Sequence, residues 1–372
     1  MLFRSHARVH RYDREPVKIV LANPRGFCAG VYMAIDVVDQ LLEICPDEPI
    51  FVFHEIVHNR HVVERFRARG VTFVESIADV PDGAIVVFSA HGVSPAIREE
   101  SRAKRLATID ATCPLVTKVH AEAIRYARKG YQILLVGHRR HQEVIGTLGE
   151  APEAMQVVEC PEDIASLTIT DPAKLVYLTQ TTLSTDDATV IINALKRAFP
   201  QIKDPPASDI CYATTNRQTA VRALAPACDL VLVVGSANSS NSVRLTEISA
   251  NVGTRARLID DASEIDPAWL EGVESVLVTA GASAPEDLVH GVIQSLVTRY
   301  GAEVEQHDIH HEDVEFGLPG TLKSAMRARG IDPDGRRIVR NYDGASLRKW
   351  FASNGIPFRT VDMTLRGAAI QR

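Results

Sequence analysis

The chain has 372 residues, of which 45% are hydrophobic and 24% are charged, and its formal net charge is -6 at pH 7. This length exceeds what one hydrophobic core usually spans, and the charge balance argues against general nucleic-acid binding. Because no run of about 18 apolar residues occurs, we expect no membrane span. The six cysteines come without a secretory signal, so we expect a cytoplasmic protein whose reduced thiols serve metal binding or chemistry.

The first structural unit follows a polar, arginine-rich arm at residues 1–16. Residues 17–22 form an apolar run that predicts a strand, and residues 23–29 form a loop with glycine and proline that carries Cys28. Residues 31–42 have apolar side chains at helical spacing. Cys28 is therefore expected at a turn from a strand to a helix.

The same order of strand, cysteine-bearing turn and helix recurs twice along the chain. It recurs around Cys113 within residues 106–129 and around Cys211 within residues 207–224, where residues 207–210 are the expected strand. Two more strand-like runs that end in polar loops follow each helix, which indicates one unit used three times. Strands that alternate with helices in this way predict parallel sheets, and ligands gather at the carboxyl ends of such strands.

These patterns predict an α/β fold of three repeated small parallel-sheet domains that could close around a pseudo-threefold axis. The expected division is an N-terminal arm at 1–16, α/β repeats at 17–112, 113–210 and 211–297, a return segment at 298–322 that packs on the first repeat, and a basic extension at 323–372. Within the extension, residues 346–353 predict a helix and residues 358–363 a short strand, so we expect a small folded appendage on the core. A docking face for an acidic electron carrier is the alternative, because residues 319–372 hold eleven Lys and Arg against four Asp and Glu.

Three of the cysteines are candidate metal ligands. Cys28, Cys113 and Cys211 stand at predicted helix N-termini, where unpaired N–H groups and the helix dipole favour the thiolate. Soft thiolates select zinc or iron-sulfur clusters, and three of them leave one coordination position open. Zinc with a histidine as fourth ligand stays open at this point. The remaining cysteines are expected to be packing residues: Cys45, Cys160 and Cys228.

The polar loops after the second and third strand-like runs form a candidate anion site. Their side chains can donate hydrogen bonds, and together with helix N-termini they suit a small phosphate ester in a cleft. The candidate donors are His58, His91, His141, Ser239, Ser240, Asn241 and Ser283. Glu143, two residues after His141, is the candidate proton donor, since burial beside an anion would raise its pKa. Thr181 could place a substrate hydroxyl or cap the helix that follows.

Seven ordered motifs cover the cysteine turns and the polar loops. They are residues 22–31 (ANPRGFCAGV), 57–60 (VHNR), 110–116 (DATCPLV), 179–184 (TQTTLS), 209–218 (DICYATTNRQ), 235–242 (GSANSSNS) and 281–285 (GASAP). Together these motifs resemble the 4-hydroxy-3-methylbut-2-enyl diphosphate reductase family, also called LytB/IspH. The likeness runs from about residue 17 to residue 322.

The resemblance implies a trefoil of three α/β domains around one central [4Fe-4S] cluster, held by Cys28, Cys113 and Cys211. It implies the last step of the non-mevalonate isoprenoid pathway, the reductive dehydroxylation of 4-hydroxy-3-methylbut-2-enyl diphosphate to isopentenyl and dimethylallyl diphosphate at the free iron. By motif, the candidate donors would hold the diphosphate, Thr181 would orient the allylic hydroxyl, and Glu143 would deliver the proton with His141 beside it. Ferredoxin or flavodoxin is the expected electron donor, and neither nucleic acid nor a membrane is an expected partner.

One loop departs from the family pattern. The family usually has Gly-His-x-Gly-His-Pro-Glu, whereas residues 137–143 read GHRRHQE, so Arg140 and Gln142 replace a glycine and a proline. Because the functional side chains remain, we expect retained activity with a shifted loop or an altered rate. Two other functions stay open: a non-redox iron-sulfur dehydratase acting on a small phosphate ester, and a zinc-stabilised phosphate-ligand-binding protein without catalysis.

Overall fold

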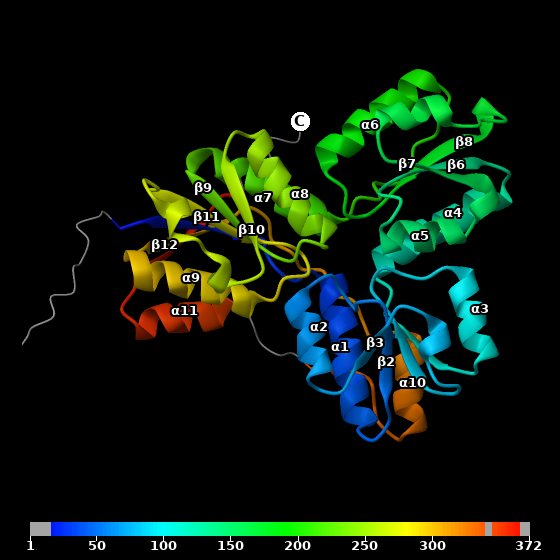
Figure 1. Cartoon of the computed structure of the whole chain (residues 1–372), viewed down its shortest axis with the longest axis horizontal. Coiled ribbons are helices and arrows are strands. Elements are labelled where there is room, and N and C mark those ends of the chain that lie inside the picture. Colours follow the sequence, from blue (N-terminus) through cyan, green and yellow to red (C-terminus); the bar gives the residue numbers. More distant parts are fainter. Residues whose placement is uncertain (1–15, 339–343, 365–372) are drawn as a thin grey trace, which may run out of the picture.

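The structure is a computed structural model that describes residues 16–338 and 344–364. Figure 1 shows three lobes that meet near the centre of the molecule, each with its own sheet and its own helices. Among the described residues the sheets have six, four and three strands, and their strand pairings are parallel. This arrangement confirms the predicted class of three small parallel-sheet α/β units. The expected N-terminal arm lies almost entirely outside the described residues.

The first lobe contains the four-stranded sheet. Its elements are α1 (Ala29–Ile44), β2 (Ile50–Phe53), α2 (Arg60–Arg67), β3 (Thr72–Val74), β4 (Ile85–Phe88), α3 (Pro95–Ala103), β5 (Ala107–Asp110) and α10 (Gly320–Ala328), with strand order β3-β2-β4-β5. Val37 and Leu41 of α1 share one buried cluster with Val52 of β2, and Leu322 and Met326 of α10 join it. The chain therefore returns to this lobe late in the sequence, after it has passed through the other two.

The second lobe contains the three-stranded sheet. Its elements are α4 (Pro114–Arg128), β6 (Gln132–Val136), α5 (Gln142–Gly149), β7 (Met155–Val158), β8 (Leu175–Thr179) and α6 (Thr185–Ala198), with strand order β7-β6-β8. Pro114 begins α4, where its fixed φ suits a helix and its missing N–H costs no hydrogen bond. Ser184 caps α6 by accepting a hydrogen bond from the backbone N–H of Asp187.

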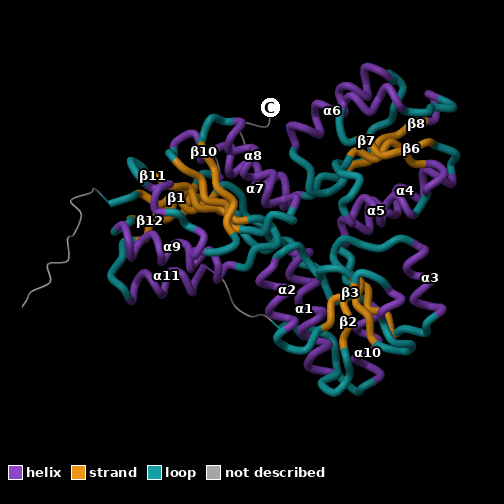
Figure 2. The backbone as a smooth tube through the Cα atoms, viewed as in Figure 1, coloured by secondary structure: helices purple, strands orange, loops and turns teal. Residues whose placement is uncertain are grey.

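The third lobe contains the six-stranded sheet, and Figure 2 shows its strands as one of three separate groups. Its elements are β1 (Lys18–Asn23), α7 (Tyr212–Leu224), β9 (Leu230–Val234), α8 (Ser240–Asn251), β10 (Arg255–Ile259), β11 (Ser275–Ala280), α9 (Glu286–Tyr300), β12 (Glu303–Asp308), α11 (Gly344–Ser353) and β13 (Phe358–Asp362), with strand order β10-β9-β11-β1-β12-β13. All five side chains of β9 are buried, as expected for a parallel strand covered on both faces.

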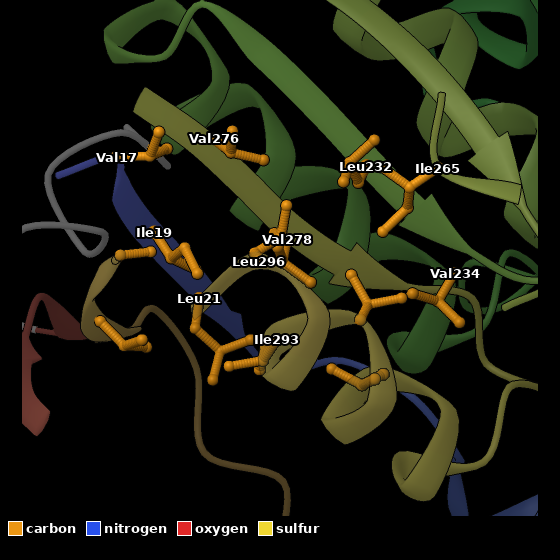
Figure 3. Packing of buried hydrophobic residues seen from close by; sticks show 14 of the residues in the cluster. Val17, Ile19, Leu21, Leu232, Val234, Ile265, Val276, Val278, Ile293 and Leu296 are labelled. Atoms are coloured by element: carbon orange, nitrogen blue, oxygen red, sulfur yellow. The ribbon is translucent and has the colours of Figure 1, made fainter. Parts of the chain in front are cut away.

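The core of the third lobe is drawn in Figure 3. Ile19 and Leu21 of β1 belong to the same buried cluster as Val278 of β11 and as Ile293 and Leu296 of α9. Full burial of a side chain of this size contributes about 1.5–3 kcal/mol. Strand β1 near the start of the chain and helix α9 more than 250 residues later are thus held together by one core.

The chain passes from one lobe to the next at each of the three cysteine turns. β1 is hydrogen-bonded between β11 and β12 in the third lobe, whereas α1, which follows Cys28, packs in the first lobe. β5 pairs with β4 in the first lobe, whereas α4, which follows Cys113, packs in the second. The sequence placed β1 within the first repeat, 17–112, so its assignment to that repeat's sheet was wrong. Local patterns predict a strand but carry no information about which long-range neighbour it pairs with.

The strand expected at residues 207–210 is absent, because this segment is a turn. It follows Pro205 and Pro206, which cannot donate hydrogen bonds to a sheet. The Lys118 amino group takes the place of a neighbouring strand by donating to the carbonyl oxygens of Ala207 and Ser208, both at 3.1 Å. The carbonyl groups of Ala207 and Ser208 are therefore satisfied by a side chain.

The C-terminal extension contains the expected helix and strand. α11 covers residues 344–353, and β13 pairs in parallel with β12, which adds one strand to the third sheet. Leu347 and Phe351 of α11 are buried in the core of that lobe. Residues 339–343 and 365–372 of the predicted extension lie outside the described residues. No helix within the described ranges combines the length and hydropathy that a bilayer crossing requires.

Candidate active site

A cavity of about 100 Å³ lies between the three lobes. The residues that sequence reasoning singled out all line it: Cys28, His58, His91, Cys113, His141, Glu143, Thr181, Cys211, Ser239, Ser240, Asn241 and Ser283. They come from loops and helix N-termini at the carboxyl ends of parallel strands, where such sheets collect ligands. The structure therefore brings together residues that are as distant in the sequence as Cys28 and Ser283, while their roles stay a prediction.

Each of the three cysteines stands at the N-terminal cap of a helix, before α1, α4 and α7. A Cβ atom added to Gly30 would lie 2.6 Å from Sγ of Cys113 and 3.9 Å from Sγ of Cys28, so both sulfurs surround a point that only glycine leaves open. Cys211 Sγ accepts a hydrogen bond from the backbone N–H of Thr214 at 3.4 Å. The three cysteines thus line a common space.

The acidity of these thiols differs from the sequence-based expectation. Burial and then the neighbouring Cys28 raise the pKa of Cys113 to about 12 and that of Cys211 to about 11. The helix dipole, which was expected to favour the thiolate, is outweighed by burial and by the mutual repulsion of the three sulfurs. A cation bound among them would offset that repulsion.

The donor set fits a group larger than a single ion. Within the described part of the chain, no three His, Cys, Asp or Glu side chains converge closely enough to hold one metal ion. Three sulfurs that share a cavity at longer range, with an open side toward other polar groups, match the demand of a multi-atom cluster for thiolate ligands. Cys45, Cys160 and Cys228 are absent from the lining of the cavity.

Three histidines form what we call the histidine side of the cavity: His58, His91 and His141, with Glu143 behind them. The rings of His58 and His91 stack with centroids 4.0 Å apart, and His141 presents an edge to both at 5.4 and 5.8 Å. Burial lowers the pKa of His91 well below its ordinary value and that of His141 to about 3, and neighbouring histidines add to both shifts. These two rings are neutral at pH 7.

Hydrogen bonds define the orientation of two of these rings. Nδ1 of His141 accepts from the backbone N–H of Glu143 at 3.1 Å, so in the neutral ring the proton resides on Nε2. Nδ1 of His58 lies 3.2 Å from a carboxylate oxygen of Glu55, which also accepts from Asn238 at 2.7 Å. Glu55 thereby connects the first lobe to the third at the edge of the cavity.

Glu143 is buried and holds a proton near neutral pH. Its carboxylate accepts from the backbone N–H of Thr181 at 2.6 Å and from Thr181 Oγ1 at 2.9 Å. Burial nevertheless raises the pKa of Glu143 to about 7, and the hydrogen bonds from Thr181 only partly oppose that shift. This is the direction expected from the sequence, and it leaves a large protonated fraction at physiological pH.

The opposite wall, which we call the serine side, consists of Ser239, Ser240, Asn241 and Ser283. Ser283 Oγ donates to the backbone oxygen of His58 at 2.8 Å and lies 3.2 Å from Ser239 Oγ. Asn241 accepts from the backbone N–H of Ala282 at 2.9 Å. Three of these residues begin α8 or precede it directly, so neutral donors combine with a helix N-terminus in a manner that suits an anion.

Sequence reasoning missed several lining residues. Thr214 contacts Cys211 through its hydroxyl at 3.2 Å and accepts from the Asn241 side chain at 3.2 Å, so it links a cysteine to the serine side. Because Thr214 lies in the first turn of the helix that follows Cys211, its place at the cavity could have been predicted from the sequence. Phe316, in contrast, comes from a segment without periodicity, and only the tertiary structure places it at the cavity.

A family model described as LytB protein matches residues 19–297 of the chain. The chain belongs to the LytB protein family. A relative in Nocardia farcinica, named 4-hydroxy-3-methylbut-2-enyl diphosphate reductase, is 54% identical over 311 residues, which are 83% of this chain and 92% of that protein. One of the same name in Acidothermus cellulolyticus is 52% identical over 314 residues, which are 84% of this chain and 92% of that protein.

Solved structures of LytB relatives agree with the fold. A structure described as E-1-hydroxy-2-methyl-but-2-enyl-4-diphosphate reductase from Plasmodium falciparum has a TM-score of 0.81 and 40% identity, and the match covers 85% of this chain and 100% of that one. Another, described as the terminal enzyme of the non-mevalonate pathway, has a TM-score of 0.55 and 33% identity, and the match covers 76% of this chain and 99% of that one. The family suggested by the seven motifs is thereby confirmed.

The loop that departs from the usual LytB pattern accommodates both substitutions. The non-glycine residues with positive φ in the described ranges are His54 and Arg105, so Arg140 occupies ordinary backbone that does not require glycine. Gln142 is the first residue of α5, where proline is favoured but a residue with an N–H is equally compatible. The positions of His141 and Glu143 therefore do not depend on the two missing residues.

Proposed function

We propose that this LytB family member is a 4-hydroxy-3-methylbut-2-enyl diphosphate reductase, which is the name its relatives carry. The observation that carries the proposal is the convergence of three cysteines, the histidine and serine sides and a protonated Glu143 on one cavity. The products would be isopentenyl and dimethylallyl diphosphate. Removal of the hydroxyl as water consumes two electrons and two protons, so the site must supply protons as well as bind the anion.

Cys28, Cys113 and Cys211 would hold a [4Fe-4S] cluster, one per chain. When bound, the cluster would supply electrons and an iron with an open coordination position that polarises the hydroxyl oxygen as a Lewis acid. Gly30 supports this assignment, since it leaves free the space that Sγ of Cys113 and Sγ of Cys28 surround. Thr214, which donates to Cys211 Sγ, would stabilise the thiolate.

The two walls of the cavity would bind the diphosphate. His58, His91 and His141 would donate from one wall, and Ser239, Ser240, Asn241 and Ser283 from the other, with the N-terminus of α8 adding positive potential. No lysine or arginine lines the cavity within the described ranges, so hydrogen bonding and proton uptake would replace fixed charge.

Thr181 and Glu143 would handle the departing hydroxyl. Thr181 Oγ1 lies 2.9 Å from a carboxylate oxygen of Glu143, so a substrate hydroxyl held by Thr181 is one hydrogen bond away from the acid. Glu143, with a pKa of about 7, would give up its proton as the C–O bond breaks and water leaves. The buried carboxylate would then recover its proton before the next turnover.

Electrons would come from a small carrier such as ferredoxin or flavodoxin, in keeping with the cytoplasmic location predicted from the sequence. The docking role of the basic extension stays a prediction, since its charged residues are distributed over α10, α11 and β13. The zinc-stabilised binding protein is disfavoured because the cysteines do not converge tightly enough for one ion. The non-redox dehydratase differs from the reductase in needing no reductant.

Anaerobic purification followed by iron, sulfide and activity measurements tests the proposal. We expect about four irons and four sulfides per chain and turnover that depends on dithionite and viologen. Cys113→Ser should lose the cluster, whereas Cys228→Ser, matched in chemistry but remote from the cavity, should retain it. Turnover of the diphosphate without a reductant would support the dehydratase, and a cluster-loaded protein inactive with reductant would refute the reductase.

A further inference from the structure

The wall of the cavity beside Cys28 includes a segment that runs from the end of β12 to α10. Glu312 of this segment accepts from the buried Arg217 guanidinium at 3.0 Å, and Arg217 also donates to the Gly26 oxygen in the Cys28 turn at 2.7 Å. Four residues later Phe316 lines the cavity. The ion pair between Glu312 and the buried Arg217 therefore fixes the start of this segment against the Cys28 turn.

The C-terminal extension contacts the same segment at Phe316. The Arg337 guanidinium donates to the backbone oxygen of Phe316 and lies 3.7 Å from Oδ2 of Asp36 on α1. The backbone N–H of Ile338 donates to Oδ1 of Asp36 at 3.0 Å. Because α1 begins directly after Cys28, these contacts connect Phe316 to the helix that follows a candidate cluster ligand.

Asp36 explains why the extension takes this path. Its side chain is only 7% exposed, and a buried carboxylate is costly unless it is paired and hydrogen-bonded. Gln40 donates to it at 3.1 Å from within α1, and the other partners come from the extension. Burial raises the pKa of Asp36, whereas the Ile338 N–H and Arg337 act in the opposite direction, so the extension stabilises the charged form.

We propose that Arg337 is a positioning residue that holds Phe316 in the wall of the cavity, so that the C-terminal extension takes part in enclosing the site. Arg337 lies 40 residues beyond the part of the chain that the family model matches. Its guanidinium is the group that joins α1 to the Phe316 backbone, and Phe316 lines the same cavity as the three cysteines. The enclosure rests on the geometry alone, and only its effect on turnover rests on the proposed function.

Thiol labelling of the full-length, reduced, iron-free chain tests the inference. Each protein is treated with N-ethylmaleimide, and the rate at each cysteine is read by mass spectrometry. We expect Arg337→Ala to raise the labelling rates of Cys28 and Cys113 about tenfold, because loss of a charge-assisted hydrogen bond increases the open population by that order. The buried Cys228 should remain protected, which separates a local opening from general unfolding.

Two further variants make the result decisive. Arg329→Ala removes an exposed ion pair with Glu48 from the same extension and should leave the Cys28 and Cys113 rates unchanged. Phe316→Ala should raise the Cys28 and Cys113 rates as Arg337→Ala does, and the double variant should add nothing, since both act through one contact. Unchanged labelling in Arg337→Ala, equal exposure of Cys228, or full additivity would overturn the inference. None of these outcomes depends on reductase activity, so they are distinguishable from failure of the proposed function.

Discussion

The histidine side and the serine side of the cavity face the same space but would bind an anion in different ways. On the histidine side, buried titratable groups crowd together, and burial lowers the pKa of His91 and His141 while raising that of Glu143. On the serine side, neutral hydroxyl and amide groups are already hydrogen-bonded to one another and to the backbone. The buried titratable groups of the histidine side lower the stability of the fold and can exchange protons. The serine side has no titratable side chain, so its hydrogen bonds do not depend on pH.

This difference teaches how a cavity without lysine or arginine can accept a highly charged ligand. A diphosphate raises the pKa of nearby imidazoles, so protons taken up by the histidine side would supply positive charge only when the ligand is present. The serine side and the N-terminus of α8 would supply orientation at all times. Variants on the two sides should therefore differ in kind as well as in size.

The largest expected effect is the loss of the proton donor. Glu143→Gln keeps the shape, and its amide can accept from the Thr181 N–H while it donates to Thr181 Oγ1, but it cannot release a proton, so we expect kcat to fall about 1,000-fold. The measurement is the reductant-dependent rate with an intact cluster. Because the pKa of Glu143 is about 7, wild-type kcat should also decline as pH rises above 7. A variant that keeps the rate and the pH profile of the wild type would remove Glu143 from the chemistry.

The same substitution should stabilise the fold at alkaline pH. The pKa of Glu143 rises from 4.5 to about 7 on folding, so its native environment is tolerated below pH 4.5 and becomes unfavourable as pH rises through 7. The neutral amide of the Glu143→Gln variant carries no such penalty, and we expect a gain of up to about 3 kcal/mol in unfolding free energy above pH 7. Denaturant titrations at pH 5 and pH 8 measure it, and an equal gain at both values would contradict the buried-acid explanation.

An intermediate effect is expected for a histidine that takes up a proton with the ligand. His141→Asn should weaken pyrophosphate binding about tenfold to thirtyfold, because a charge-assisted hydrogen bond is lost. Calorimetry in buffers of different ionisation enthalpy should show proton uptake by the wild type and less by the variant. Absence of proton uptake in the wild type at pH 6.5 would break the contrast between the two sides.

A smaller effect is expected on the serine side. Ser283→Ala removes one neutral hydroxyl that donates to the His58 backbone, so pyrophosphate binding should weaken about fivefold. The number of protons taken up should equal that of the wild type, since no titratable group is changed. A reduced proton uptake in this variant would show that the two sides act as one coupled network.

The smallest effect is expected in the loop that departs from the family pattern. Arg140→Gly and Gln142→Pro restore the usual residues where neither backbone position requires them, so kcat should change by less than about twofold. Gln142→Pro should stabilise the fold by about 0.5 kcal/mol, because proline restricts the unfolded chain at a position that suits it. A tenfold rise in kcat would instead show that this loop limits the reaction.

The sequence alone was enough to predict the strand-turn-helix units around Cys28 and Cys113, the position of each cysteine at a helix N-terminus, and twelve of the residues that line the cavity. These features depend on apolar periodicity and on turn chemistry, which are local properties of the chain. The family resemblance added the proposed roles of His58, Glu143 and their neighbours, which local patterns could not supply.

Only the tertiary structure decided which partners these units take. It placed β1 in the third lobe, replaced the strand expected at 207–210 with carbonyl contacts to Lys118, and connected Arg337 to Phe316. It also showed that burial, which depends on the whole packed chain, raises the pKa of Cys113 and Cys211. Strand pairing, burial and long-range ion pairs are selected by the free energy of the complete fold, and no short window of sequence contains it.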